Sequence, residues 1–224
     1  MKKFSTLVAI TLTLSLFLVS CNKTAEQKPN TTNTEKIKVP KKPAPVVVLN
    51  ANLATESDLV ALGLSADVVN KLLAARPFLS MSDFNAILEV ENTEELFKKI
   101  FLPLNLNTTE EKAFKMIPGV GDKMAHEFEE YRPYTSILNF KREIGKYVDQ
   151  QEVARYLDYV FVPVELNTST EDDIKALPGI GKKMTHEFLE YRPYKNLAQF
   201  RKEIGKYVDD KELNRLERFV YIKE

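Results

Sequence analysis

Tryptophan is absent from the 224-residue chain, cysteine occurs once, histidine twice and glycine only seven times. A single cysteine excludes an intramolecular disulfide, so apolar packing must stabilise the fold. The 32 basic residues are balanced by 32 acidic residues, so the chain lacks the overall basic excess that proteins binding nucleic acid normally have. Long hydrophobic runs are also missing, apart from one that extends from Leu7 to Val19.

The amino-terminal residues have the pattern of an export signal. Two lysines precede the apolar run, which is too short to span a bilayer comfortably. The run ends in the letters LVSC, which resemble the lipobox of bacterial lipoproteins. The resemblance implies that residues 1–20 are a lipoprotein signal peptide and that Cys21 is acylated, which anchors the chain to a membrane of the bacterial cell envelope, facing the periplasm or the exterior. The alternative is an ordinary secretory signal with an incidental cysteine.

A spacer follows the cysteine. Residues 22–48 contain six lysines, two glutamates and four prolines, and they have few apolar residues before position 46. Such a composition cannot bury enough apolar surface to fold alone. We therefore expect residues 21–48 to comprise the acylated cysteine and a disordered linker. Fully extended, this linker reaches roughly 90 Å at about 3.3 Å per residue.

The chain repeats itself after residue 48. Residues 104–162 align without a gap to residues 164–222, with 29 of 59 positions identical. Residues 49–103 are a divergent copy in which Leu62 falls where Ile117 falls in the second. We therefore expect three domains: a degenerate first copy (49–103), a second copy (104–163) and a third copy (164–224). Copies of about 55 to 60 residues are marginally stable alone, so neighbours should pack together.

The stretch from 166 to 194 predicts a helical hairpin. Thr168 and Glu171 have the spacing of a capping box at a helix start. The turn PGIG at 178–181 ends that helix, because proline lacks an amide and glycine tolerates positive φ. A second helix follows and ends before Pro193, with apolar residues on one face at Met184, Phe188 and Tyr191.

Two further helices are expected in each copy. In the third copy their apolar positions are Leu197, Phe200 and Ile204, then Leu213, Leu216 and Val220. Alternation with a period of two residues is nearly absent. We therefore predict an all-α fold.

The hairpin resembles the helix-hairpin-helix motif, and the letters LNTST, PGIGKKM and EYRPY resemble the version in the ComEA family of competence DNA receptors. The resemblance implies tandem helix-hairpin-helix repeats that bind the backbone of double-stranded DNA without reading its bases, with DNA uptake as a natural role. Amides at the start of the second helix, with the helix dipole, suit a phosphate. The candidate DNA-binding residues are Gly119, Gly121, Lys123, Gly179, Gly181, Lys182 and Lys183.

The chain departs from this pattern in several places. The second hairpins carry IGKYVD in place of a second glycine turn, and the first copy reads Gly63-Leu64-Ser65 with no lysine after it. Asp122 occupies the place of Lys182 and should repel a phosphate, so we expect the third copy to dominate binding. Lys175, Arg201 and Lys202 could add to a basic patch there.

Charge favours an alternative function. The three copies have 4 basic and 8 acidic, 8 and 10, and 12 and 12 residues, respectively. This balance suits a non-catalytic scaffold or protein-interaction lipoprotein that binds an envelope protein instead of DNA. The small extrinsic photosystem II protein, a relative in the helix-hairpin-helix family, is likewise an assembly subunit and not a DNA receptor. In either case we expect a monomer, tethered to the membrane through Cys21.

The sequence shows no catalytic or metal-binding pattern. It has no Ser-His-Asp arrangement in a recognisable context, no Walker-type phosphate loop and no isolated carboxylate pair in an apolar setting. His126 and His186 occupy equivalent positions, but neither has the second histidine of a zinc-protease helix. We therefore predict no enzymatic activity, no cofactor and no metal, and exposed helical positions for both histidines.

The repeated EYRPY motif has a structural interpretation. Tyr131 and Tyr191 should pack in the core, because tyrosine carries a large apolar ring. Arg132 and Arg192 should hydrogen-bond the carbonyl groups at the end of the preceding helix. This interpretation is preferred to an aromatic site for nucleic-acid bases.

Overall fold

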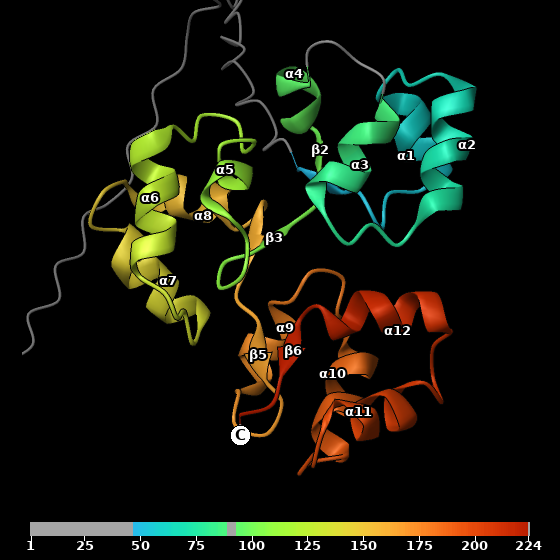
Figure 1. The fold of residues 1–224 in the computed structure, drawn as a ribbon, viewed down its shortest axis with the longest axis vertical. Helices are drawn as coiled ribbons and strands as arrows, with labels where there is room; N and C mark the ends of the chain where they lie inside the picture. Colours follow the sequence, from blue (N-terminus) through green and yellow to red (C-terminus); the bar gives the residue numbers. More distant parts are fainter. Residues whose placement is uncertain (1–46, 89–92, 224) are drawn as a thin grey trace, which may run out of the picture. The chain divides into compact units, whose positions relative to one another are not determined.

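Helices dominate the computed structural model, which describes residues 47–88 and 93–223 (Figure 1). Within these ranges the chain forms twelve helices, four in each copy. The prediction of a mainly helical fold is therefore confirmed. No helix in the described part is long and apolar enough to cross a membrane. The predicted signal peptide, Cys21 and the linker up to residue 46 lie outside the described residues.

Each copy has the same order of elements: a short strand, four helices and a second short strand. The first copy consists of β1 (Leu49–Asn50), α1 (Glu56–Ala61), α2 (Ala66–Ala75), α3 (Met81–Leu88), α4 (Glu94–Phe97) and β2 (Ile100–Phe101). The second consists of β3 (Leu104–Asn105), α5 (Glu111–Phe114), α6 (Asp122–Glu130), α7 (Ile137–Ile144), α8 (Gln150–Tyr156) and β4 (Val160–Phe161). The third consists of β5 (Val164–Glu165), α9 (Glu171–Lys175), α10 (Lys182–Glu190), α11 (Leu197–Ile204), α12 (Asp210–Glu217) and β6 (Val220–Tyr221).

The strands correct the all-α prediction. β1 pairs with β2, β3 with β4 and β5 with β6, each pair parallel, so the first and last residues of every copy are joined. Leu49 lies opposite Ile100, for example, and Val164 lies opposite Val220. A strand of two residues is too short to show alternation, and both β4 residues are buried. The sequence pattern therefore did not reveal these pairs.

Side chains that cap the helix starts fix most of the boundaries. Thr55 and Asp58 form a complete capping box at α1. The predicted capping box at Thr168 is wrong, because α9 begins two residues later, where Thr170 accepts a hydrogen bond from the Asp173 amide. The Thr168 hydroxyl instead donates to Glu165, at 2.6 Å.

Aromatic rings fill the centre of each copy. In the second copy, Phe128 lies 5.3 Å from Phe114 and 5.2 Å from Tyr156, both in edge-on geometry. Edge-to-face packing of this kind stabilises beyond the burial of apolar area. The corresponding ring in the third copy, Phe188, packs against Phe200 at 5.1 Å. Phe188 and Phe200 lie on the apolar faces that the sequence predicted.

Neighbouring copies share apolar contacts, as their small size predicts. Phe101 of the first copy packs against Tyr159 of the second, with ring centres 5.1 Å apart. Phe161 of the second copy packs against Phe219 of the third, at 4.7 Å. The guanidinium of Arg218 also donates to the Phe78 carbonyl of the first copy, at 3.1 Å. The three copies are therefore held together by contacts as well as by the chain.

The EYRPY motif closes the second and third copies on their own first residues. The side-chain amide of Asn107 donates to the Tyr134 carbonyl and accepts from the Tyr134 amide, both at 2.8 Å. Arg132 donates to the carbonyls of Leu106 and Thr109. The prediction that this arginine binds helix-end carbonyls is thus wrong: its carbonyl acceptors lie in the loop before α5.

The third copy repeats this closure. Asn167 pairs with Tyr194 in the same way, and Arg192 donates to the Ser169 carbonyl at 2.8 Å. The core tyrosines of the motif are Tyr134 and Tyr194. Tyr131 and Tyr191, predicted to be core residues, are half-buried at its edge.

Candidate functional site

The three first-hairpin turns share one backbone feature. Gly63, Gly119 and Gly179 all have positive φ, at 83°, 80° and 72°, a conformation that residues with a Cβ rarely adopt. The first copy therefore keeps a glycine at the tightest position, although Ser65 replaces the second glycine. Its turn is one residue shorter, because Leu62 precedes Gly63 directly where the other copies insert a proline.

The second glycine of each intact turn leaves a helix start uncapped. Gly121 is the N-cap residue of α6, and Gly181 is the N-cap residue of α10. Neither helix start has a capping hydrogen bond from a side chain. The other described helices of eight or more residues begin at a side chain that accepts from the first turn: Ser65, Ser80, Ser136, Asn196 and Asp209. The first amides of a helix have no intrahelical acceptor. Those of α6 and α10 are therefore open to a ligand.

Packing does not require these two glycines. A Cβ added at Gly121 or Gly181 would have no heavy atom within 4 Å. Their φ values of −93° and −83° suit any residue. Ser65, at the same place in the first copy, has a similar backbone and caps α2 through its hydroxyl. Neither packing nor backbone conformation therefore requires glycine at these two positions.

The third-copy turn (Pro178–Gly181) leads into two exposed lysines. Lys182 has no ion-pair partner within the described residues. The Lys183 ammonium lies 5.5 Å from the centre of the Tyr207 ring. This contact leaves the positive charge of the lysine uncompensated, because the ring is neutral. Two exposed lysines thus occupy the first two positions of α10, the helix whose first amides are open.

The second-copy turn (Pro118–Gly121) has a different charge. The carboxylate of Asp122 lies 2.6 Å from the Lys115 ammonium, and hydrogen bonding to this lysine lowers the pKa of Asp122. Asp122 therefore stays ionised at the start of α6. Lys123 lies over the Tyr147 ring at 5.9 Å, as Lys183 lies over Tyr207.

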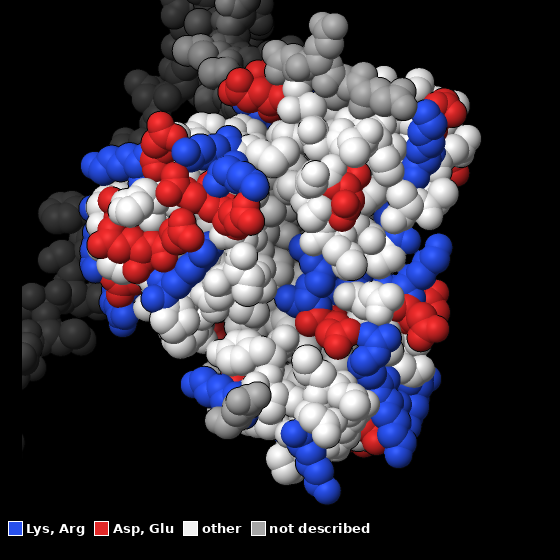
Figure 2. Space-filling model, viewed as in Figure 1, with Lys and Arg blue, Asp and Glu red and all other residues white. Residues whose placement is uncertain are grey.

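Carboxylates pair with two of the three cations that were expected to enlarge the patch. Lys175 forms an ion pair with Glu171 at 2.6 Å, and Arg201 forms one with Glu217 of α12. Lys202 is exposed. Figure 2 shows the same mixture over much of the visible face, where blue and red side chains lie next to each other. A basic surface is therefore local at most.

Two arginines that the sequence interpretation missed lie against the turns. Arg215 of α12 is buried and donates to the Pro178 carbonyl at 2.8 Å, while two hydrogen bonds of 2.7 Å fix it to Glu212. Arg155 of α8 lies beside Gly119 and is bound to Glu152 in the same way. The identical Glu-x-x-Arg spacing in both copies was the signal that could have revealed them.

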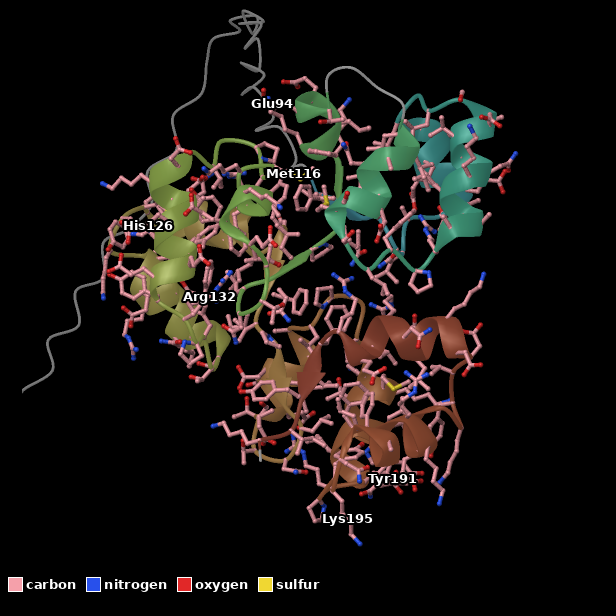
Figure 3. All side chains as sticks on the ribbon, in the orientation of Figure 1. Glu94, Met116, His126, Arg132, Tyr191 and Lys195 are labelled. Atoms are coloured by element: carbon pink, nitrogen blue, oxygen red, sulfur yellow. The ribbon has the colours of Figure 1, made fainter. Side chains whose placement is uncertain are left out.

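The first copy lies next to both intact turns. A Cβ added at Gly179 would collide with the Leu53 side chain of the first copy. A cavity of about 350 Å³ is lined by Pro118 and Gly119 and by residues of α4 and its start, among them Glu94. Figure 3 labels Glu94 at α4. Gly121 and Gly181 have no such neighbour. The open side of each site is therefore formed by the second glycine and the residues after it.

The histidines take no part in these sites. His126 and His186 are exposed on α6 and α10, as predicted, with Nε2 3.6 Å from Glu130 and 3.4 Å from Glu190. Figure 3 shows His126 on the outer side of α6. In the described ranges, no three His, Cys, Asp or Glu side chains are grouped as metal ligands.

The seven predicted DNA-binding residues form two clusters. Gly119, Gly121 and Lys123 lie at the second-copy turn, and Gly179, Gly181, Lys182 and Lys183 lie at the third-copy turn. Cys21 lies outside the described residues. Comparisons of the chain with protein-family models, with curated proteins and with solved structures found no match.

Proposed function

We propose that this chain is a ComEA-like protein with three tandem helix-hairpin-helix repeats, tethered to the bacterial envelope through Cys21, that binds duplex DNA without reading its sequence. The observation that carries the proposal is the pair of uncapped helix starts at Gly121 and Gly181, on a chain whose other long described helices are capped. Open amides and the helix dipole together favour a phosphate. Handling of incoming DNA is the role that fits this location.

The third copy supplies most of the affinity. Lys182 and Lys183 add positive charge beside the open amides of α10, whereas Asp122 opposes a phosphate at α6. Few cations take part, so binding should be weak and should fall with salt concentration. The second turn raises the effective concentration of binding sites once the third-copy turn holds a duplex, and tethering of many chains on one membrane has the same effect.

A single substitution separates DNA binding from folding. Gly181→Asp places a carboxylate where a Cβ meets no atom. Aspartate is a good capping residue and interacts well with a helix start. We expect the variant to fold at least as stably as the wild type, and its affinity for a short labelled duplex to fall by about tenfold or more at low salt. Fluorescence anisotropy and urea denaturation measure the two effects.

Ser65→Asp is the matched control, because it changes the same position of the first copy. This variant should bind DNA like the wild type. A Gly181→Asp protein that is folded and binds DNA with unchanged affinity would contradict the proposal. The test avoids Gly179, because a side chain there would collide with Leu53 and because the backbone has a positive φ.

The second candidate function is a scaffold lipoprotein that binds an envelope protein. It is favoured by Leu53 and Glu94, which place the first copy beside both glycine turns. In this case the turns would serve packing between copies. Absence of DNA binding by the wild-type protein, even at low salt, would select this candidate.

A further inference from the structure

A pair of tyrosines links the two hairpins of the third copy. Tyr191 follows α10, and Tyr207 lies in the loop after α11. Their hydroxyl oxygens are 2.7 Å apart. Each ring also faces an ammonium group of the other hairpin: Lys183 lies 5.5 Å from the Tyr207 ring centre, and Lys206 lies 4.9 Å from that of Tyr191.

The second copy contains the same arrangement. The hydroxyl groups of Tyr131 and Tyr147 are 2.7 Å apart. Lys123 lies 5.9 Å from the Tyr147 ring centre, and Lys146 lies 4.7 Å from that of Tyr131. A geometry that occurs twice, with the same residue types, is a feature of the repeat and not an accident of one loop.

Further contacts hold Tyr207 in place. Its hydroxyl oxygen lies 2.7 Å from that of Tyr191, and Tyr191 and the nearby carboxylate of the buried Glu187 raise the pKa of Tyr207. The loop that carries it is not itself a glycine turn of the phosphate-binding kind. Gly205 has an ordinary helical backbone, with φ of −61°. This loop therefore offers no second glycine turn to a phosphate, and its contact with the first hairpin is made by Tyr207.

Tyrosines next to a phosphate site can serve in two ways. They can stack on unpaired bases, as in proteins that bind single strands, or they can hold a cation through the ring face. Here each ring is approached by an ammonium group of the other hairpin. The geometry suits the second use.

We infer that Tyr207 positions the Lys183 ammonium beside the open amides of α10, so that the second hairpin completes the phosphate site of the first. The inference rests on the proposed function. In it Tyr207 is a positioning residue, and Lys183 is the group that meets the phosphate. The first copy has no lysine after its turn and no tyrosine at all among its residues.

The test compares Tyr207→Leu with Tyr207→Phe in the chain from residue 22 onward, without lipid. Leucine removes the ring, whereas phenylalanine keeps it and loses only the hydroxyl group. We expect Tyr207→Leu to lower the slope of log affinity against log salt by about 0.9, as for the loss of one phosphate contact. Tyr207→Phe should restore the wild-type slope. In a Lys183→Gln background, Tyr207→Leu should change the slope no further.

Tyr147→Leu is the matched control in the second copy and should have the smaller effect on the slope. An unchanged slope in a folded Tyr207→Leu protein would overturn the inference. Tighter binding of single strands than of duplex, lost in Tyr207→Leu, would also overturn it, because the ring would then be a stacking surface.

A second measurement separates this inference from the proposed function. The side-chain protons of Lys183 next to the ammonium should show a ring-current shift in NMR spectra, absent in Tyr207→Leu. If the wild type binds no DNA, the proposed function fails, and the phosphate role of Lys183 fails with it. If the wild type binds DNA but the Lys183 protons show no shift, the positioning by Tyr207 fails alone.

Discussion

The second-copy and third-copy turns have nearly the same backbone and different surroundings. Their glycines have φ of 80° and 72°, and both of the following helices start without a side-chain cap. The next residue is Asp122 in one copy and Lys182 in the other. Duplication has thus kept the geometry, while the charge that a phosphate would meet has changed sign.

The first copy extends this comparison. It retains Gly63 at positive φ but has Ser65 as a capping residue and no lysine after it. Positive φ at the tightest position is therefore needed to make the turn, whatever the ligand. The side chains at the second glycine and after it decide whether the helix start stays open and attracts an anion. Experiments on the comparison should alter these positions one at a time.

The largest effect is expected from charge reversal at the third-copy turn. Lys182→Glu with Lys183→Glu should reduce affinity for duplex DNA by more than about tenfold at low salt and lower the salt slope by about two. Both lysines are exposed, so the fold should survive, which circular dichroism can check. Fluorescence anisotropy over a salt series measures the affinity.

Replacing Lys141 and Lys211 with glutamate is the control, because it changes the net charge equally away from either turn. An equal loss of affinity in this control would show that the total charge matters and the third-copy turn does not.

A smaller effect, on stability, is expected from Gly179→Ala and Gly119→Ala. An L-residue in the left-handed region costs about 1–2 kcal/mol. Gly179→Ala should cost slightly more, because its Cβ also displaces the Leu53 side chain, whereas a Cβ at Gly119 lies an ordinary 3.6 Å from Arg155. Urea midpoints of the two variants measure the difference.

Leu53→Ala in the Gly179→Ala background should remove that difference, since the displaced side chain is gone. Gly121→Ala, at a site with open space and ordinary φ, should change stability much less than either. If Gly179→Ala is as mild as Gly121→Ala, the positive-φ account of the turn is wrong.

The sequence predicted local features well because the interactions that produce them are local. The glycine turn, the helix that follows it and the apolar face of Phe188 all depend on residues within a few positions of each other. The start of α9 was misplaced by two residues, because Thr168 and Thr170 are both plausible capping residues. The structure distinguishes them, because the Thr168 hydroxyl group donates to Glu165 and does not cap the helix.

Contacts between distant residues could not be predicted in the same way. The bond from Arg215 to the Pro178 carbonyl joins residues 37 positions apart, and the approach of Leu53 to Gly179 joins different copies. The strand pairs join the two ends of each copy through only two residues per strand. Periodicity carries no information about such contacts, because they depend on how the hairpins pack.

Exchange of a single charge should make the second-copy turn resemble the third. Asp122→Lys removes the ionised carboxylate from the start of α6 and adds a cation. We expect affinity for duplex DNA to rise by about three- to tenfold at low salt, with a salt slope larger by about one. Anisotropy titrations measure both. The same gain from Asp149→Lys, at the start of α8, would mean that the turn itself is not involved.

The smallest effect concerns Glu165, which stands in the third copy where Asn105 stands in the second. Both side chains accept from the amide two residues later, at 3.0 Å and 2.9 Å. Burial alone would raise the pKa of Glu165, but hydrogen bonds from Thr168, Lys223 and Asn167 outweigh it, so the pKa is lowered from its ordinary 4.5.

A lowered carboxyl pKa stabilises the folded state above the ordinary value and ceases to do so as the pH falls through the folded-state pKa. Glu165→Asn should therefore lower the urea midpoint near pH 7. Near pH 3 the difference in urea midpoint between the variant and the wild type should be smaller. Asn105→Glu, the reverse exchange in the second copy, is the companion variant and should gain acid sensitivity. A gap of equal size at both pH values would mean that Glu165 stabilises the third copy by packing alone.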